Sequence, residues 1–151
     1  MKKLLLTVLA VAGVYAADGY EVFKNKCQQC HIESISKADV MKKFALMKAD
    51  KEAGVKTHEK EYMKAPPMVE VSARLKENII IKDDEEDVHR QVVIAFIKEY
   101  IDNPKLDYSM CEVMALEKFG VMPSQKGKLT NEEKQAVAEW IYDRYDGVSF
   151  K

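Results

Sequence analysis

Two cysteines and a histidine lie within five residues of one another near the start of the chain, in the stretch KNKCQQCHIES, residues 24–34. Cys27 and Cys30 stand three positions apart, and His31 follows the second thiol directly. Paired cysteines at this spacing serve four chemistries, namely a redox dithiol, a structural zinc site, a short-range disulfide and covalent attachment of haem. The residues beside the pair indicate which of the four the chain supports.

The first three chemistries leave part of the sequence unexplained. A thioredoxin-like dithiol belongs in a βαβ context, whereas Cys27 follows a helical pattern. A zinc site needs four ligands, and the remaining donors His58, His89 and Cys111 are scattered singly along the chain. A disulfide framework would leave one of the three cysteines unpaired. The dithiol and the zinc site also give His31 no role.

Covalent attachment of haem uses all three residues. On one helical turn, thiols at positions i and i+3 lie on the same face and can add to the two vinyl groups of one porphyrin. The next residue is carried over the ring, where its imidazole reaches the iron. The motif therefore predicts one haem c, held covalently by Cys27 and Cys30, with His31 as the first axial ligand of the iron.

A second iron ligand decides what such a haem does, because one protein ligand leaves the iron open to gases or peroxide, whereas two close it for electron transfer. Met122 stands apart among the available donors, because Gly120 and Pro123 fix a loop only eight residues before the predicted helix cap at Thr130. The soft and imidazole donors in the mature chain are Met41, Met47, Met63, Met68, Met110, Met114, Met122, His58 and His89.

Other donors remain open as the second ligand. Met68 is the main rival, since Pro66 and Pro67 also favour an extended segment that could reach the iron. Met110, Met114 and His58 are further alternatives.

The first sixteen residues, MKKLLLTVLAVAGVYA, read as a secretory signal. Lys2 and Lys3 precede an apolar run over residues 4–16, and small residues suit a signal peptidase that cleaves after Ala16. The run is shorter than the roughly 20 apolar residues that span a bilayer. We therefore expect an exported protein without stable membrane insertion after cleavage, in the periplasm, where haem c is attached.

Cleavage would leave residues 17–151, enough for a single domain with a modest core. The mature chain carries 22 basic and 25 acidic side chains, a formal charge of −3. Binding to nucleic acid would require a clustered basic excess, so we expect no nucleic-acid partner.

Both ends of the mature chain are expected to be helical. Near its start, Gly19, Phe23 and Cys27 recur every four residues. Near its end, the segment LTNEEKQAVAEWIYDRY begins with Thr130 and Glu133 at the spacing of a capping box. The apolar face of this second helix consists of Val137, Trp140, Ile141 and Tyr145.

A third helix is expected over residues 92–101, ending before Asn103 and Pro104. An acidic run, residues 83–87, precedes it, and negative charge at a helix start is favoured by about 0.3–1 kcal/mol per group. We expect this helix to wall the haem. Its apolar stripe consists of Val93, Phe96, Ile97, Tyr100 and Ile101.

The middle of the chain is less informative. The segment SKADVMKKFALM could form a helix with Val40, Met41, Phe44 and Met47 on one face. Residues of about 33–90 hold the surplus length, as loops or helices whose role the sequence does not specify.

Taken together, these features resemble the class I cytochrome c family. Gly19, Phe23 and Cys27 match the family's N-terminal helix, whose glycine permits close crossing by the C-terminal helix. The resemblance covers residues 18–31 and 119–145 well, and 92–104 loosely. It implies an all-α class I cytochrome c fold, in which the N- and C-terminal helices cross and further helices and loops enclose the haem.

The resemblance also implies a function. The family places its ligand methionine in a Met-Pro setting such as Met122, whereas Met68 precedes Thr130 by 62 residues, far more than the family's usual tail. We therefore expect His31 and Met122 to ligate the iron of a periplasmic monohaem cytochrome. Such a protein is not an enzyme, and it transfers single electrons between redox partner proteins. The alternatives are a haem-based ligand-binding or sensor protein, and a haem subunit of a larger periplasmic oxidoreductase.

Overall fold

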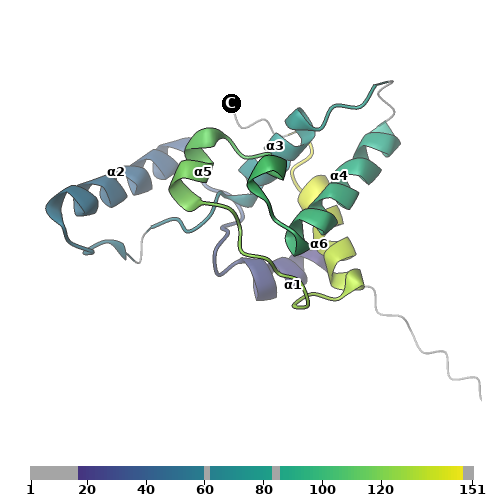
Figure 1. Ribbon diagram of the computed structural model, residues 1–151, viewed down its shortest axis with the longest axis horizontal. Coiled ribbons are helices and arrows are strands. Elements are labelled where there is room, and N and C mark those ends of the chain that lie inside the picture. The colour runs from purple at the N-terminus through teal and green to yellow at the C-terminus, as the bar shows by residue number, and fades with distance from the viewer. Residues whose placement is uncertain (1–16, 60–61, 83–85, 148–151) are drawn as a thin grey trace, which may run out of the picture.

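A computed structural model of the chain describes residues 17–59, 62–82 and 86–147. The expected signal peptide, residues 1–16, lies outside these residues. Within the described ranges the regular elements are all helical and no strand occurs, so the expected all-α class is confirmed. The α-helices are α1 Gly19–Val22, α2 Lys37–Ala53, α3 Met68–Asn78, α4 Glu86–Asp102, α5 Val113–Phe119 and α6 Asn131–Asp143 (Figure 1).

The N-terminal helix is short and changes its winding. Asp18 caps α1, because its carboxylate accepts hydrogen bonds from the backbone N–H groups of Tyr20 (2.8 Å) and Glu21 (3.3 Å). The chain then continues as a π-helical turn, Phe23–Cys27, closed by the N–H of Gln28 on the carbonyl of Phe23 at 2.9 Å. This wider turn ends at Cys27, the first of the two cysteines of the motif.

The two terminal helices pack closely against each other at Gly19. A Cβ atom on Gly19 would lie 2.2 Å from the carbonyl oxygen of Ala136 and 2.5 Å from the Cβ of Trp140. Only glycine therefore fits at this crossing, as the family resemblance implied. Next to it, the rings of Phe23 and Trp140 stack with their centroids 4.7 Å apart, and Phe23 is fully buried.

The C-terminal helix begins with the predicted capping box, in which Thr130 and Glu133 bond reciprocally at 2.8 and 3.2 Å. Its inner face lies in the core, where α4 packs beside it. The expected helix over 92–101 is thus confirmed within the longer α4. The core consists mainly of Val22, Phe23, Met68, Leu75, Val93, Ile94, Ile97, Ile101, Leu129, Val137, Ala138, Ile141, Tyr142 and Tyr145.

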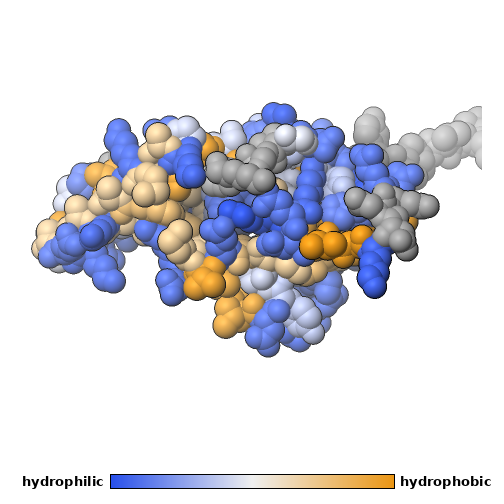
Figure 2. Space-filling view, turned by 90° about the horizontal axis from the view of Figure 1, so that it is seen from above, coloured by the Kyte–Doolittle hydropathy of each residue, from blue (hydrophilic) through white to orange (hydrophobic). Residues whose placement is uncertain are grey.

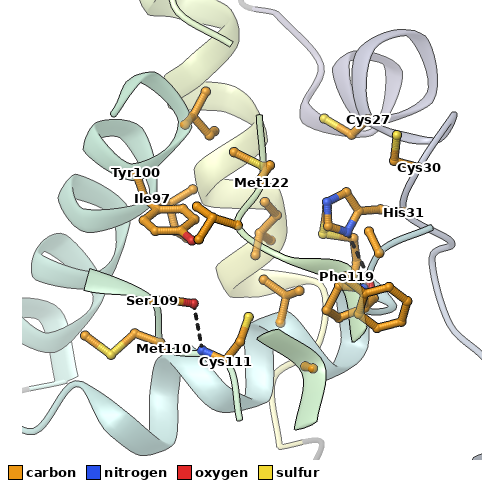
Figure 3. A pocket seen from close by; sticks show the side chains of 18 of the residues that line it. Cys27, Cys30, His31, Ile97, Tyr100, Ser109, Met110, Cys111, Phe119 and Met122 are labelled. Carbon is orange, nitrogen blue, oxygen red and sulfur yellow. Dashed lines mark hydrogen bonds between the residues drawn. The ribbon is translucent and has the colours of Figure 1, made fainter. Parts of the chain in front are cut away.

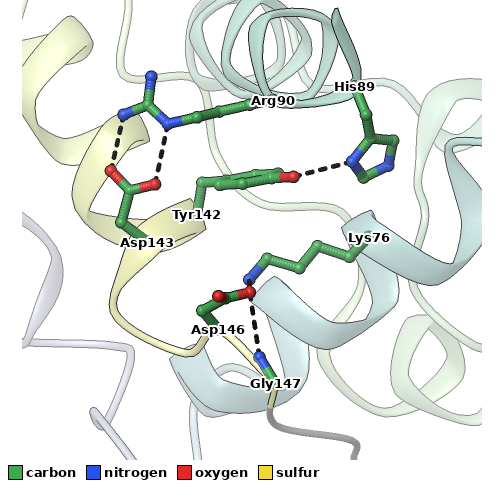
Figure 4. A network of polar contacts seen from close by, with 7 residues as sticks. All are labelled: Lys76, His89, Arg90, Tyr142, Asp143, Asp146 and Gly147. Carbon is green, nitrogen blue, oxygen red and sulfur yellow. Dashed lines mark hydrogen bonds and ion pairs between the residues drawn. The ribbon is translucent and has the colours of Figure 1, made fainter. Parts of the chain in front are cut away.

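A polar network ties α3, α4 and α6 together around the Tyr142 ring (Figure 4). The hydroxyl of Tyr142 donates to Nδ1 of His89 at 2.8 Å, while Nε2–H of His89 donates to the carbonyl of Ile79 at 2.9 Å. Arg90 makes two bonds to Asp143, at 2.9 and 2.6 Å. Two cations, those of Lys76 and Arg90, lie over the ring of Tyr142. These contacts fix the helices that wall the cavity described below.

Helix α2 projects from the rest of the molecule (Figure 1). Its expected helical state is confirmed, but only Val40 and Asp50 are buried along its 17 residues. Of the predicted face of Val40, Met41, Phe44 and Met47, Val40 is buried whereas Met41 is 61% exposed. Figure 2 shows weakly apolar and hydrophilic side chains intermixed at this end of the molecule.

The C-terminal end of α2 is closed by a buried carboxylate. Asp50 accepts hydrogen bonds from the backbone N–H of His58 (2.7 Å), from Nδ1–H of His58 (2.9 Å) and from the Tyr62 hydroxyl (2.6 Å). These bonds lower the pKa of Asp50 to about 2, and they fold the segment after Gly54 back onto the helix.

No helix in the described ranges is both long enough and apolar enough to cross a membrane.

Candidate functional site

A cavity of about 200 Å³, measured as the space open to the centres of water molecules, lies among the cysteine motif, α3, α4, α5 and the loop before α6 (Figure 3). One water occupies about 10–15 Å³ on this measure, so the space suits a much larger ligand. Its walls are largely apolar and aromatic. They include Val71, Leu75, Phe96, Ile97, Tyr100, Ile101, Leu116, Phe119, Val121, Leu129, Val137 and Ile141.

The two cysteines of the motif stand side by side at one edge of this cavity (Figure 3). The N–H groups of Cys30 and His31 both donate to the carbonyl of Cys27, at 3.0 and 2.9 Å, which closes the predicted single turn. Burial raises the pKa of Cys27 to about 11, with a smaller contribution from Cys30. At neutral pH the Cys27 thiol is therefore protonated in the absence of a bound group.

The His31 imidazole is oriented by a backbone carbonyl. Its Nδ1–H donates to the oxygen of Pro66 at 2.8 Å, which fixes the tautomer and leaves the lone pair on Nε2 available to a metal. Burial of the ring lowers the pKa of His31, with partial opposition from the bond to Pro66. A neutral, oriented imidazole in the wall of an apolar cavity is suited to ligate iron.

Met68 lies on the same wall as His31. Its backbone N–H donates to the carbonyl of Ile32 at 2.8 Å, and the next N–H, of Val69, donates to Glu33 at 3.1 Å. The segment that carries Met68 thus runs beside the residues that follow His31. Met68 and His31 therefore reach the cavity from adjacent segments of the chain.

Met122 lies across the cavity from His31 (Figure 3). The loop that carries it is anchored to the end of α4, because the N–H of Gln125 donates to the carbonyl of Ile101 at 2.9 Å and the Ser124 hydroxyl donates to that of Asp102 at 2.6 Å. The structure therefore places Cys27, Cys30, His31 and Met122 around one cavity.

The remaining candidate ligands differ in whether they line the cavity. Met110 lines the cavity and packs against the core, so it stays an alternative to Met122. Met114 is 73% exposed and does not line the cavity. His58 is bound to Asp50 beneath α2, outside the cavity.

Comparison of sequences finds a relative that matches nearly the whole chain. An uncharacterized protein of Aquifex aeolicus (strain VF5) is 39% identical over 151 residues, which cover 96% of this chain and 89% of that protein. The chain belongs to the family of this Aquifex protein. No protein-family model and no solved structure matches the chain.

Three further residues that line the cavity were not predicted from the sequence as part of the site, namely Glu70, Arg74 and Cys111. Glu70 and Arg74 lie on α3, which the sequence did not predict as a helix, so their place on its cavity face could not be predicted either. The one available signal was their spacing of four, which places them on the same side of a helix. Cys111 is half-buried, and burial raises the pKa of its thiol.

An unsatisfied donor provides a test of whether haem fits this site. Within the described part of the chain, Nε of Arg74 is buried without a hydrogen-bond acceptor, although the two other nitrogens of the guanidinium bond to Glu77 (3.2 Å) and Glu112 (2.5 Å). A buried unpaired donor costs about 1–3 kcal/mol unless a ligand supplies an acceptor. An apolar group that carries carboxylates and a metal, as haem does, suits this wall together with the thiols and the imidazole.

Clusters of His, Cys, Asp or Glu with three or more members able to hold a metal ion are absent from residues 17–59, 62–82 and 86–147.

Proposed function

We propose that the chain is an exported monohaem c-type cytochrome with a class I cytochrome c fold, which carries single electrons between redox partner proteins. The observation that carries this proposal is the arrangement of Cys27, Cys30 and His31 opposite Met122 around one largely apolar cavity. Each of these side chains has a separate task at such a site, and together they account for the whole motif.

The two cysteines would hold the cofactor covalently. Each thiol adds across one vinyl group, so that a carbon–sulfur bond forms and the thiol proton goes to the neighbouring carbon. The single turn between Cys27 and His31 sets the thiols three residues apart at the cavity edge. Because Cys30 is exposed while Cys27 is half-buried, this edge of the cofactor would lie nearest to the protein surface and would serve as the entry point for electrons.

His31 and Met122 would ligate the iron of the bound haem. Bound haem supplies the one-electron couple of its iron. Nε2 of His31 is free to bind iron because Nδ1 is engaged by Pro66, and the Met122 thioether is a soft donor that favours the reduced metal. The apolar walls from α3 and α4 would exclude water from the ring.

The fold supports the same proposal. α1 and α6 cross at Gly19 with no space for a side chain, and α4 forms one wall of the cavity. The export and periplasmic location rest on the sequence of residues 1–16 alone.

Covalent attachment and the optical spectrum test the proposal directly. The exported protein should retain its haem after acid–acetone extraction and should have a low-spin spectrum in both oxidation states. The double variant Cys27→Ser/Cys30→Ser should lose covalent haem, whereas Cys111→Ser, a control at a thiol outside the motif, should keep it. Haem that is extracted from the wild type by acid–acetone would contradict the proposal. Rapid carbon monoxide binding by the wild type would favour the sensor alternative.

A further inference from the structure

Part of the cavity wall is polar, in contrast to the rest of its lining. Figure 3 shows Ser109 and Cys111 on a stretch of chain separate from Cys27 and Cys30. Glu70 of α3 lines the same cavity and lies close enough to the Cys111 thiol to raise its pKa electrostatically.

Charges at this part of the wall are not balanced. The Arg74 guanidinium is already paired with Glu77 at 3.2 Å and with Glu112 at 2.5 Å. Glu70 is a third carboxylate near the same cation. Within the described residues, no hydrogen bond or ion pair reaches the Glu70 carboxylate. One arginine therefore faces three carboxylates, and the one without a direct partner lines the cavity.

The environment of Glu70 favours its protonated form. Burial raises its pKa above the ordinary value of 4.5, the positive charge of Arg74 opposes this, and the negative charge of Glu112 adds to it. Burial also keeps the nearby Cys111 thiol protonated. Besides Glu70, Arg74 and Cys111, the titratable residues that line the cavity within the described ranges are Lys26, Cys27, Cys30, His31, Lys64 and Tyr100.

We infer that Glu70 couples electron transfer to proton transfer, taking up a proton when the cofactor accepts an electron and releasing it when the electron leaves. This inference rests on the proposed function. The electron comes from the redox partner and lowers the iron from the ferric to the ferrous state, while the proton comes from solvent and forms an O–H bond on the Glu70 carboxylate. Reduction removes one positive charge from the cavity, so an ionised carboxylate in its wall loses a favourable interaction.

This linkage has a definite sign. The oxidised cofactor favours ionised Glu70 and the reduced cofactor favours the protonated form, so the reduction potential should fall as the pH rises through the titration of Glu70. Full coupling of one proton to one electron corresponds to a tenfold change in equilibrium constant per pH unit, or about 59 mV. Partial coupling gives a smaller slope over a limited pH range.

The experiment is a spectroelectrochemical titration of the haem-bearing protein between pH 4.5 and pH 8, for the wild type, Glu70→Gln and Glu117→Gln. Glu117 is a matched control, because it is an exposed carboxylate on α5 that does not line the cavity. The wild type and Glu117→Gln should show the same falling potential with pH. Glu70→Gln should lose this slope while keeping the low-spin spectrum of the wild type.

Two further measurements decide the matter if Glu70→Gln does not fold. Glu70→Asp keeps a titrating group and should retain a slope centred at another pH. A pH indicator in weakly buffered wild-type protein should report proton uptake on reduction. A wild-type potential that is independent of pH, or a slope that persists in Glu70→Gln because haem propionates titrate instead, would overturn the inference. Either outcome leaves the proposed function intact if the haem is covalent and low-spin.

Discussion

At the scale of single residues, the candidate site depends on which side chains face each other across the cavity. His31 is oriented by Pro66, and Met68 lies along the same wall because its backbone bonds to Ile32. Met122 approaches from the loop anchored to α4. The two methionines that the sequence left as alternatives therefore differ in position. Met68 lies beside the segment that follows His31, whereas Met122 lies on the loop anchored to α4.

Substitution of Met122 tests this assignment. We expect Met122→Ala to remove the sulfur-to-iron charge-transfer band, to lower the reduction potential and to let carbon monoxide bind quickly, because the thioether that favours ferrous iron is lost. Optical spectra, redox titration and stopped-flow mixing measure these effects. Met68→Ala should disturb packing only, at a cost of about 2–5 kcal/mol for a buried methionine. If Met110→Ala opens the iron and Met122→Ala does not, the ligand is Met110.

At the scale of helices, long periodic segments could be predicted from the sequence and short or projecting ones could not. The apolar stripe of α4 and the cap of α6 were predictable because each is encoded locally, in spacing or in the pair Thr130 and Glu133. Helix α3 was missed because Pro66 and Pro67 indicated an extended segment, and that signal gave no reason for a helix to begin at Met68. The exposure of Met41 depends on how α2 leaves the bundle, which local sequence does not encode.

The crossing of α1 and α6 can be tested at Gly19. Gly19→Ala should destabilise the protein by about 1–3 kcal/mol or more, because its Cβ would overlap the Ala136 carbonyl and the Trp140 side chain. Urea denaturation measures this change. Gly54→Ala is a useful comparison, since its Cβ would meet nothing within 4 Å while its φ of +67° still costs about 1–2 kcal/mol. Equal stability of Gly19→Ala and wild type would mean that the two helices do not cross at this residue.

The hydrogen bonds that join Asp50 of α2 to His58 and Tyr62 should depend on pH. Its pKa is about 2 in the folded chain against an ordinary 3.8, so the stabilisation is present above pH 3.8 and is lost as the pH falls from about 4 toward 2. We expect Asp50→Asn to mimic this loss at neutral pH and to speed hydrogen exchange of the His58 amide, which NMR can follow. Glu52→Gln, on the exposed side of the same helix, should leave that amide protected. Unchanged exchange in Asp50→Asn would show that the carboxylate does not hold the segment.

At the scale of the whole molecule, the described core surrounds a cavity that is itself largely apolar. Side chains from α3, α4, α5 and the loop before α6 meet there, and they belong to segments far apart in the sequence. The cysteine motif and its histidine were therefore predictable from adjacent residues, whereas the places of Glu70, Arg74 and Cys111 depend on tertiary packing alone.

A chain built around such a cavity should be less stable when nothing fills it. We expect Cys27→Ser/Cys30→Ser, purified without haem, to unfold at a lower temperature than the haem-bearing protein, because a bound group stabilises only the folded state. A loss of about 3 kcal/mol would lower the melting temperature by roughly 10 °C. Circular dichroism provides the measurement, and haem-bearing Cys111→Ser should melt with the wild type. Identical melting of the two forms would indicate that the helices pack without help from the cavity's contents.

The bond between the Met68 N–H and the Ile32 carbonyl, 2.8 Å long, has a consequence for how this chain tolerates change. A second bond beside it, 3.1 Å long, joins the Val69 N–H to the Glu33 carbonyl, so residues 34–63, which include α2, form a detour whose two ends meet. Lengthening a loop whose ends are joined costs little loop-closure entropy, about 0.6 kcal/mol for each doubling of the loop length. The detour can therefore change in length at little cost to the turn that holds His31. Its one aromatic contact with the cavity wall is at Phe44, whose ring centroid lies 6.1 Å from that of Phe119 within the described residues.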